Sequence, residues 1–114
     1  MKLLIVDDNA EMRKLMKSLL SELAEDIFEC SDGSQACAAY SLHRPDWVLM
    51  DIEMPQMDGI TASQKLRNAF PAARIVIVTK YDDEEMREDA ANAGACGYVF
   101  KENLPALRNI IAQA

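Results

Sequence analysis

Polar side chains that can bind a cation or a phosphoryl group follow or end four apolar runs of this sequence. They are Asp7 and Asp8 after the first run, Asp51 in the middle of the chain, Thr79 further on and Lys101 near the end. Three carboxylates brought together repel one another, which raises a pKa or requires a cation. Their oxygen atoms are ligands that suit Mg²⁺. A carboxylate beside a metal ion and an ammonium group can attack a phosphoryl group, because that reaction depends mainly on positioning and charge neutralisation.

The segments between these residues alternate between short apolar runs and amphipathic stretches. The apolar runs predict strands at residues 2–6, 26–30, 47–50, 74–78 and 96–100. Apolar residues spaced by three and four predict a helix after each strand. The first helix carries Met12, Leu15, Met16, Leu19, Leu20 and Leu23, the second Ala36, Cys37, Ala39 and Tyr40, the third runs from Gly59 to about Phe70, the fourth carries Met86, Ala90 and Ala93, and the fifth Leu104, Leu107, Ile110 and Ile111.

Capping residues mark the ends of two of these helices. Any of residues 7–9 can cap the first helix. We expect Asp82 to cap the fourth, with Glu85 three residues on as its capping-box partner. Gly94 is expected to end that helix.

Five strand–helix units predict an α/β fold with one five-stranded parallel sheet. Strands this uniformly apolar are covered by helices on both faces, and right-handed crossovers make the sheet doubly wound. The run at 26–30 is interrupted by Glu29, so we expect it at an edge. Sites in such sheets lie outside the carboxyl ends of the strands, so the polar strand ends are expected to converge there.

Composition limits the class of protein. The 114 residues are enough for one domain, and we expect a single domain over 1–114. The net charge of −7 argues against direct nucleic-acid binding and against an anionic membrane surface. No apolar run approaches the roughly 20 residues of a membrane span, and the N-terminus turns acidic too soon for a signal peptide. Three cysteines without metal spacing are expected to be reduced, as in a cytoplasmic protein.

The sequence as a whole resembles the receiver domain of the response regulators of two-component signalling. The resemblance rests on Leu4-Ile5-Val6-Asp7-Asp8, on Asp51-Ile52-Glu53-Met54-Pro55 with Met57-Asp58-Gly59, on Val78-Thr79, and on Gly97-Tyr98-Val99-Phe100-Lys101. It covers essentially the whole chain. It implies a flavodoxin-like sheet with strand order 2-1-3-4-5, and a Mg²⁺-dependent, phosphorylatable signalling switch that catalyses only its own phosphorylation and dephosphorylation.

The resemblance also implies roles for the acidic residues. Asp51 matches the phosphoacceptor, and Asp8 the direct Mg²⁺ ligand. Asp7 matches the acidic neighbour that orients metal-bound water. The backbone carbonyl of Glu53 would complete the metal site.

Further positions match the part of the family that reads out phosphorylation. Thr79 matches the switch hydroxyl, Lys101 the lysine that pairs with the phosphoryl group, and Tyr98 the aromatic residue that turns inward with the switch. Lys80 departs from the family, which usually has a small residue there, so it is expected to crowd the site or add a positive charge. Glu102 stands where many receivers have proline, which removes the reason for a cis peptide bond there.

The resemblance implies protein partners. The phosphoryl group would come from a sensor histidine kinase, a phosphotransfer protein or a small phosphodonor. The output would be a changed surface on the fourth helix, fifth strand and fifth helix. That surface would regulate an output domain or partner, including one that controls transcription, or form a phosphorylation-dependent homodimer.

Two other functions fit parts of the sequence. A small aspartyl-phosphate phosphatase needs an acid two residues after its nucleophile, and Glu53 has that spacing from Asp51. A flavodoxin-like cofactor binder needs a phosphate-binding loop after the first strand, and residues 7–10 are not rich in Ser, Thr or Gly. Turnover of a phosphate monoester and the colour of the purified protein distinguish these alternatives.

Overall fold

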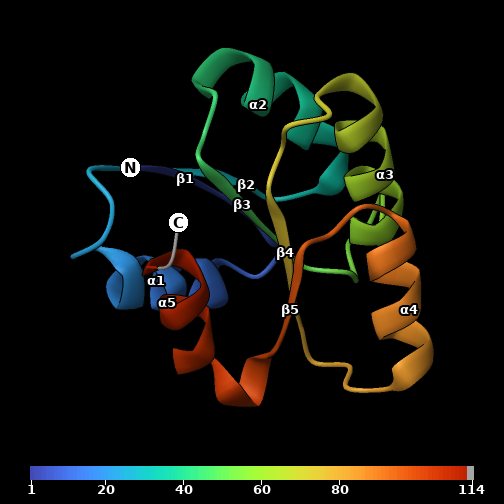
Figure 1. Ribbon diagram of the computed structural model, residues 1–114. Helices are drawn as coiled ribbons and strands as arrows, with labels where there is room; N and C mark the ends of the chain where they lie inside the picture. The colour runs from blue at the N-terminus through green and yellow to red at the C-terminus, as the bar shows by residue number, and fades with distance from the viewer. Residues whose placement is uncertain (113–114) are drawn as a thin grey trace.

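A computed structural model describes residues 1–112, which form five strands and five α-helices in alternation (Figure 1). The strands are β1 (Lys2–Val6), β2 (Asp26–Cys30), β3 (Trp47–Met50), β4 (Ile75–Thr79) and β5 (Gly97–Phe100). The α-helices are α1 (Ala10–Leu20), α2 (Ala36–His43), α3 (Gly59–Ala69), α4 (Glu84–Asn92) and α5 (Pro105–Ala112), with short 3₁₀ helices η1 (Gly33–Gln35) and η2 (Lys101–Asn103). The predicted strand–helix alternation is confirmed, and strand boundaries shift by one residue at β4 and β5.

The strands form one parallel sheet in the order β2-β1-β3-β4-β5, as predicted. β1, β3 and β4 each pair with two neighbours, whereas β2 and β5 lie at the edges. The edge position of β2 suits Glu29, which is exposed on it. A charged side chain on an edge strand can remain in contact with water.

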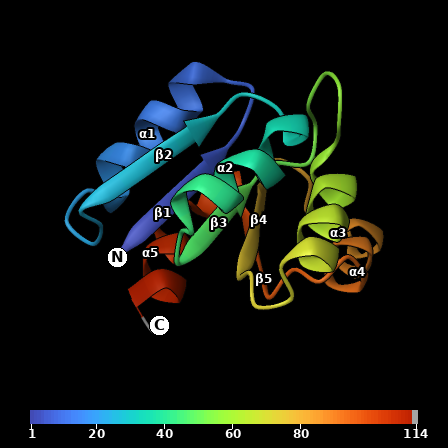
Figure 2. The ribbon, with the colours of Figure 1, turned by 90° about the horizontal axis from the view of Figure 1, so that it is seen from above.

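Helices cover both faces of the sheet (Figures 1 and 2). α1 and α5 pack on one face, and α2, α3 and α4 on the other. Successive side chains of a strand point to opposite faces, so Leu3 and Ile5 of β1 enter the α1/α5 core while Leu4 and Val6 enter the α2–α4 core. Burial on both faces explains why the central strands are apolar at nearly every position.

The start of α4 differs from the prediction. Asp83, and not Asp82, is the N-cap, and its side chain accepts a hydrogen bond from the Met86 N–H. Glu85 is therefore two residues after the cap, one short of the capping-box position. Asp82 forms an ion pair with Arg87 instead.

The helix stripes are otherwise close to those expected. In α1, Met16 and Leu20 are buried, but Leu15 is 52% exposed, because the 100° turn per residue carries it away from the stripe. Asn9 is the residue that caps α1, and Gly94 follows α4 with φ of +101°, as expected of a helix end. Across residues 1–112, none of the helices has the length and hydropathy to span a membrane.

Candidate functional site

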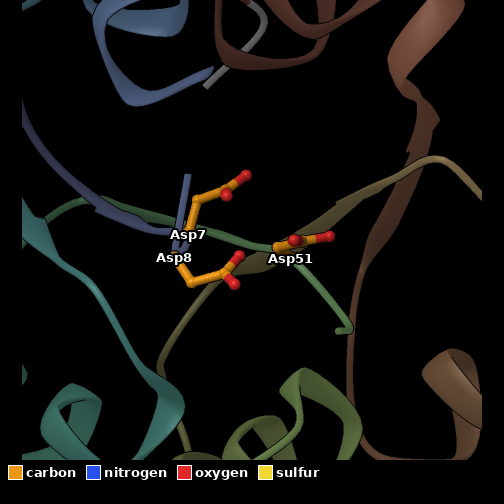
Figure 3. A group of neighbouring side chains, drawn as sticks. All are labelled: Asp7, Asp8 and Asp51. Carbon is orange, nitrogen blue, oxygen red and sulfur yellow. The ribbon is translucent and has the colours of Figure 1, made fainter. Parts of the chain in front are cut away.

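The register of β1 and β3 places the carboxylates side by side. Val6 lies opposite Met50, and the backbone N–H of Asp51 donates to the carbonyl of Val6 at 2.9 Å. Asp7 and Asp51 are therefore the next residues at the carboxyl ends of adjacent strands. Together with Asp8 they each offer one carboxylate oxygen, and these three oxygens lie within 4.8 Å of one another. Figure 3 shows the three side chains together. The convergence expected from the sequence is confirmed for these three residues.

The alternation of side chains explains why Lys101 reaches two of these carboxylates. Asp7, Asp51 and Lys101 continue the alternation of Ile5, Leu49 and Val99, which enter the α1/α5 core. The Lys101 ammonium nitrogen lies 3.0 Å from Asp7 Oδ2 and 3.3 Å from Asp51 Oδ2. One cation thus faces two buried anions, which leaves the group negatively charged.

Asp7 is a fully buried carboxylate. Its Oδ1 accepts a hydrogen bond from the Asn9 N–H at 2.9 Å. Within the described residues its Oδ2 makes no hydrogen bond, although it forms the ion pair with Lys101. A buried anionic oxygen with spare lone pairs is suited to a further cation or to metal-bound water.

Burial raises the pKa of Asp51 from its ordinary 3.8 to about 6. Loss of hydration is the largest cause, and the charge of Asp7 adds to it. The Lys101 ammonium and the backbone N–H of Ile52, which donates at 2.9 Å, lower the pKa in part. A positive charge brought to this place would stabilise the ionised carboxylate.

These groups lie beside an open cleft of about 630 Å³ at the carboxyl edge of the sheet. Its lining is Asp8, Asn9, Asp51, Glu53, Met54, Pro55, Lys80 and Lys101. The carboxylates that line the cleft outnumber its two ammonium groups, and hard carboxylate oxygens with room for water fit a Mg²⁺ ion. The group formed by Asp7, Asp8 and Asp51 could hold such a metal ion.

The loop after Asp51 is fixed by close backbone contacts. Gly59 packs so tightly that a Cβ built on it would lie 1.7 Å from the carbonyl oxygen of Asp51. The Gly59 N–H donates to the carbonyl of Ile52 at 2.7 Å. Asp32, after β2, accepts a hydrogen bond from the Gln56 N–H at 3.0 Å. The loop that carries Glu53 is therefore held at both ends.

Thr79 is a buried residue at the end of β4, and its hydroxyl oxygen accepts the N–H of Tyr81 at 3.3 Å. By alternation it continues Ile77 and so points to the face of α2–α4, opposite to Lys101. Tyr98 packs on this same face, and its hydroxyl donates to the carbonyl of Tyr81 at 2.7 Å. The segment after β4 is thus held by Thr79 and by Tyr98.

Lys80 does not pair with Asp51. Its ammonium lies 3.3 Å from Glu53 Oε2, and both side chains are mostly exposed at the rim of the cleft. The same Glu53 oxygen accepts the hydroxyl of Tyr81 at 2.6 Å. The hydrogen bond from Tyr81, followed by the contact with Lys80, lowers the pKa of Glu53. The expected positive charge of Lys80 is present, but Glu53 offsets it.

The sequence reasoning missed three residues around the site. Tyr81 belongs to the loop after Thr79, and only the path of that loop brings it to Glu53. Arg13 on α1 donates a hydrogen bond to the backbone carbonyl of Asp7. Asp32 had a detectable signal, because it follows β2 and so stands at a fifth strand end on the same edge.

Comparisons with known proteins agree with this geometry. The sequence matches the family described as response regulator receiver domain over residues 3–112. It is 41% identical over 101 residues to the chemotaxis protein CheY of Bacillus subtilis (strain 168), covering 88% of this chain and 84% of that protein. It is 36% identical over 104 residues to the oxygen regulatory protein NreC of Staphylococcus haemolyticus, covering 89% of this chain but 48% of that protein.

A solved structure shares both the fold and the implied cofactor. The response regulator protein TrrA from Thermotoga maritima, in complex with Mg²⁺ and BeF, superposes with a TM-score of 0.87 at 29% identity. The match covers 98% of this chain and 96% of that one. That protein holds Mg²⁺ and a phosphoryl mimic on the fold described above.

Proposed function

This chain belongs to the response regulator receiver domain family, and on that premise we propose that Asp51 is the residue that accepts the phosphoryl group. The chain is a phosphorylatable signalling switch, and its chemistry is limited to its own phosphorylation and dephosphorylation. A kinase partner supplies the phosphoryl group. The observation that supports Asp51 is its place at the cleft between Asp7 and Lys101, with a pKa raised to about 6.

The proposed reaction is attack by a carboxylate oxygen of Asp51 on phosphorus. The new O–P bond forms as the bond from phosphorus to the donor breaks. A donor phosphohistidine that is protonated on its other ring nitrogen takes the electron pair of the broken N–P bond and leaves as neutral imidazole. The ammonium of Lys101, 3.3 Å from Asp51 Oδ2, is positioned to neutralise charge on the transferred oxygens. When bound, Mg²⁺ would supply further positive charge to the transferred group.

For the metal ion we propose Asp8 as the direct ligand and Asp7 as the residue that orients metal-bound water. Asp8 is exposed toward the cleft, whereas Asp7 is buried and already engaged by Asn9 and Lys101. Asp51 and the backbone carbonyl of Glu53 complete the proposed set. The fixed loop after Asp51 supports the role of that carbonyl.

For the readout we propose that the Thr79 hydroxyl donates a hydrogen bond to the phosphoryl group and that the Tyr98 side chain moves in response. Thr79 now accepts the N–H of Tyr81, and Tyr98 holds the carbonyl of the same residue. A new partner for Thr79 would therefore act on a segment that Tyr98 also contacts. Phosphorylation would shift the population between two arrangements of this segment.

The proposed output surface is α4, β5 and α5. The guanidinium of Arg87 on α4 lies 4.6 Å from the ring centre of Tyr98, so a change at Tyr98 reaches the surface of α4. An output domain, a separate partner or a second copy of the chain would bind there. We further propose that residues 1–114 act as one cytoplasmic receiver unit, supported by the family match over 3–112.

The phosphatase alternative has less support. Its general acid would be Glu53, but hydrogen bonding from Tyr81 lowers the pKa of that carboxyl. An ionised carboxylate that already accepts two partners is a poor proton donor at neutral pH. Absence of turnover with a phosphate monoester would agree with this reading.

The test of Asp51 is stoichiometric binding of beryllofluoride in the presence of Mg²⁺, with acetyl phosphate as the covalent donor. The wild-type chain is expected to bind one equivalent and to gain one phosphoryl group by intact mass. Asp51→Asn is expected to do neither, whereas Asp89→Asn, a change of an exposed carboxylate on α4, should behave as wild type. Unchanged binding by Asp51→Asn would refute the assignment.

A separate test addresses the readout. Thr79→Ala and Lys101→Ala are expected to retain Mg²⁺ binding, but beryllofluoride should no longer shift the NMR signals of Tyr98 and α4. Thr79→Ser keeps the hydroxyl and should retain the shift. A full shift in Thr79→Ala would contradict the proposed role of that hydroxyl.

A further inference from the structure

Arg13 joins the end of β1 to the edge strand β2. Its Nη1 donates to the backbone carbonyl of Asp7 at 2.7 Å, and its Nε donates to Glu29 Oε1 at 3.0 Å. The Arg13 side chain is 19% exposed, and its contact with the Asp7 carbonyl is partly buried, whereas its contact with Glu29 lies at the surface. Lys17, one turn further along α1, donates to the other Glu29 oxygen at 3.1 Å. The closeness of α1 to β2 can be followed in Figure 2.

The carbonyl of Asp7 lies where the β-sheet ladder ends. The last ladder bond on the β2 side is from the Asp7 N–H to the carbonyl of Cys30, and α1 begins only after Asn9. The carbonyl group between these elements therefore needs a partner from elsewhere. Arg13 supplies that partner. It thereby fixes the peptide unit that joins Asp7 to Asp8.

We propose that Arg13 is a positioning residue for Mg²⁺, which holds the Asp7–Asp8 peptide so that both carboxylates face the metal. This inference rests on the proposed metal-binding roles of Asp7 and Asp8. Groups that orient metal ligands without touching the ion typically affect metal affinity by 10–100-fold. Because Arg13 acts through the backbone, we expect about a tenfold loss on its removal, at the lower end of that range.

The geometry requires the planar fork of arginine. Nε reaches Glu29 while Nη1 reaches the Asp7 carbonyl, and these atoms lie on different edges of one rigid group. A lysine has a single nitrogen and cannot hold both positions. Arg13→Lys is therefore expected to lose most of the effect although it keeps the charge.

The sign of the change separates positioning from simple electrostatics. Removal of a positive charge near three carboxylates should by itself strengthen Mg²⁺ binding. The positioning role predicts that removal of Arg13 weakens Mg²⁺ binding. Arg13 is already paired with Glu29, which offsets its charge, so the loss of positioning is expected to dominate.

The experiment is a Mg²⁺ titration of the metal-free chain, followed by the amide NMR signals of residues 7–9 and 51–53. Arg13→Met removes the head group and keeps an apolar stem of similar reach. Lys17→Met is the matched control, because it removes the same charge from the same helix and from the same Glu29. We expect about a tenfold weaker Kd for Arg13→Met, and an unchanged or tighter Kd for Lys17→Met.

A second readout does not involve the metal. In the metal-free chain the Asn9 N–H is hydrogen-bonded to Asp7 Oδ1, so it should exchange slowly with solvent. Arg13→Met and Arg13→Lys are expected to speed that exchange, whereas Lys17→Met should not. Glu29→Gln, which weakens the anchor of Arg13, should give an intermediate result in both measurements.

The outcomes also distinguish this inference from the proposed function. At saturating Mg²⁺, Arg13→Met should still bind beryllofluoride through Asp51. If wild type and Arg13→Met bind Mg²⁺ equally, or the variant binds more tightly, the positioning role is overturned while the function stands. If wild type binds neither Mg²⁺ nor beryllofluoride, the proposed function itself fails.

Discussion

Replacement of Asp51 by asparagine should stabilise the metal-free fold at neutral pH. The folded-state pKa of Asp51 is about 6, against 3.8 for an ordinary aspartate, so the folded chain binds this proton more tightly than the unfolded chain. The charged form therefore opposes folding above pH 6. The difference between the two values corresponds to about 3 kcal/mol. Asp51→Asn is nearly isosteric and removes this penalty, so about 3 kcal/mol is the expected upper limit of its gain.

The sign of the pH dependence follows from the same linkage. In wild type the destabilisation by Asp51 is complete above pH 6, declines as the pH falls through about 6, and is absent below about 3.8, where both states are protonated. The asparagine variant lacks this titration. The free energy of unfolding of the variant minus that of wild type should therefore be largest at pH 7 and approach zero near pH 4. Other carboxyl groups titrate in both proteins and largely cancel.

The assay is urea unfolding in EDTA at several pH values, followed by the fluorescence of the single tryptophan, Trp47, which is buried in β3. Asp89→Asn controls for the loss of a charge on the surface and should change the stability by no more than about 0.5 kcal/mol. Addition of Mg²⁺ should stabilise wild type by mass action and narrow its difference from Asp51→Asn. A variant no more stable than wild type at pH 7, or a difference constant between pH 4 and 7, would refute the reasoning.

Three further substitutions test other parts of the site. Lys101→Met should raise the pKa of Asp51 above about 6, because the ammonium group 3.3 Å away lowers that pKa in the wild type. A carboxyl-carbon NMR titration in EDTA measures the pKa of Asp51, and a lower pKa in the variant would contradict the prediction. Gly59→Ala should lower the free energy of unfolding by about 3 kcal/mol or more, since its Cβ would lie 1.7 Å from the Asp51 carbonyl oxygen. Near-wild-type stability would show that the loop after Asp51 can move to accommodate the methyl group. Lys80→Met should shorten the lifetime of the phosphorylated form about twofold to fivefold, because the exposed ion pair between Lys80 and Glu53 at the rim of the cleft is lost. Intact mass over time measures the dephosphorylation rate, and an unaltered rate would argue against a role of Lys80 in that lifetime.

The arrangement of the acidic site could be predicted from the sequence because it depends on few rules. Apolar runs mark the strands, and parallel strands bring their carboxyl ends to one edge. Asp7 and Asp51 each follow such a run directly, so an error of one residue in a strand boundary does not move them from that edge. The contact of Lys101 with both carboxylates follows from the alternation of side chains along the strands.

Other features depend on contacts that the sequence does not encode locally. Consecutive acidic residues precede α4, and each of the first two has a side chain able to cap it, so Asp82 and Asp83 could not be distinguished. The bond from Tyr81 to Glu53 depends on the paths of two loops. Arg13 spans two elements that only the fold brings together. Periodicity placed Leu15 in the stripe, because spacing alone does not fix where an apolar stripe ends.

The strand order has a mechanical consequence. β1 and β3, which carry the acidic residues, are hydrogen-bonded on both sides, whereas β5, which carries Tyr98, has a single neighbour. Local opening of β5 breaks one ladder, while displacement of β1 or β3 breaks two, so the stiffness of the sheet falls from its centre toward that edge. The proposed phosphoryl transfer would thus take place beside the stiffest strands of the sheet, and the proposed rearrangement for partner binding would occur where deformation costs least. Substitutions that adapt β5 and its flanking segments to a new partner can accumulate without weakening the pairing of β1 and β3.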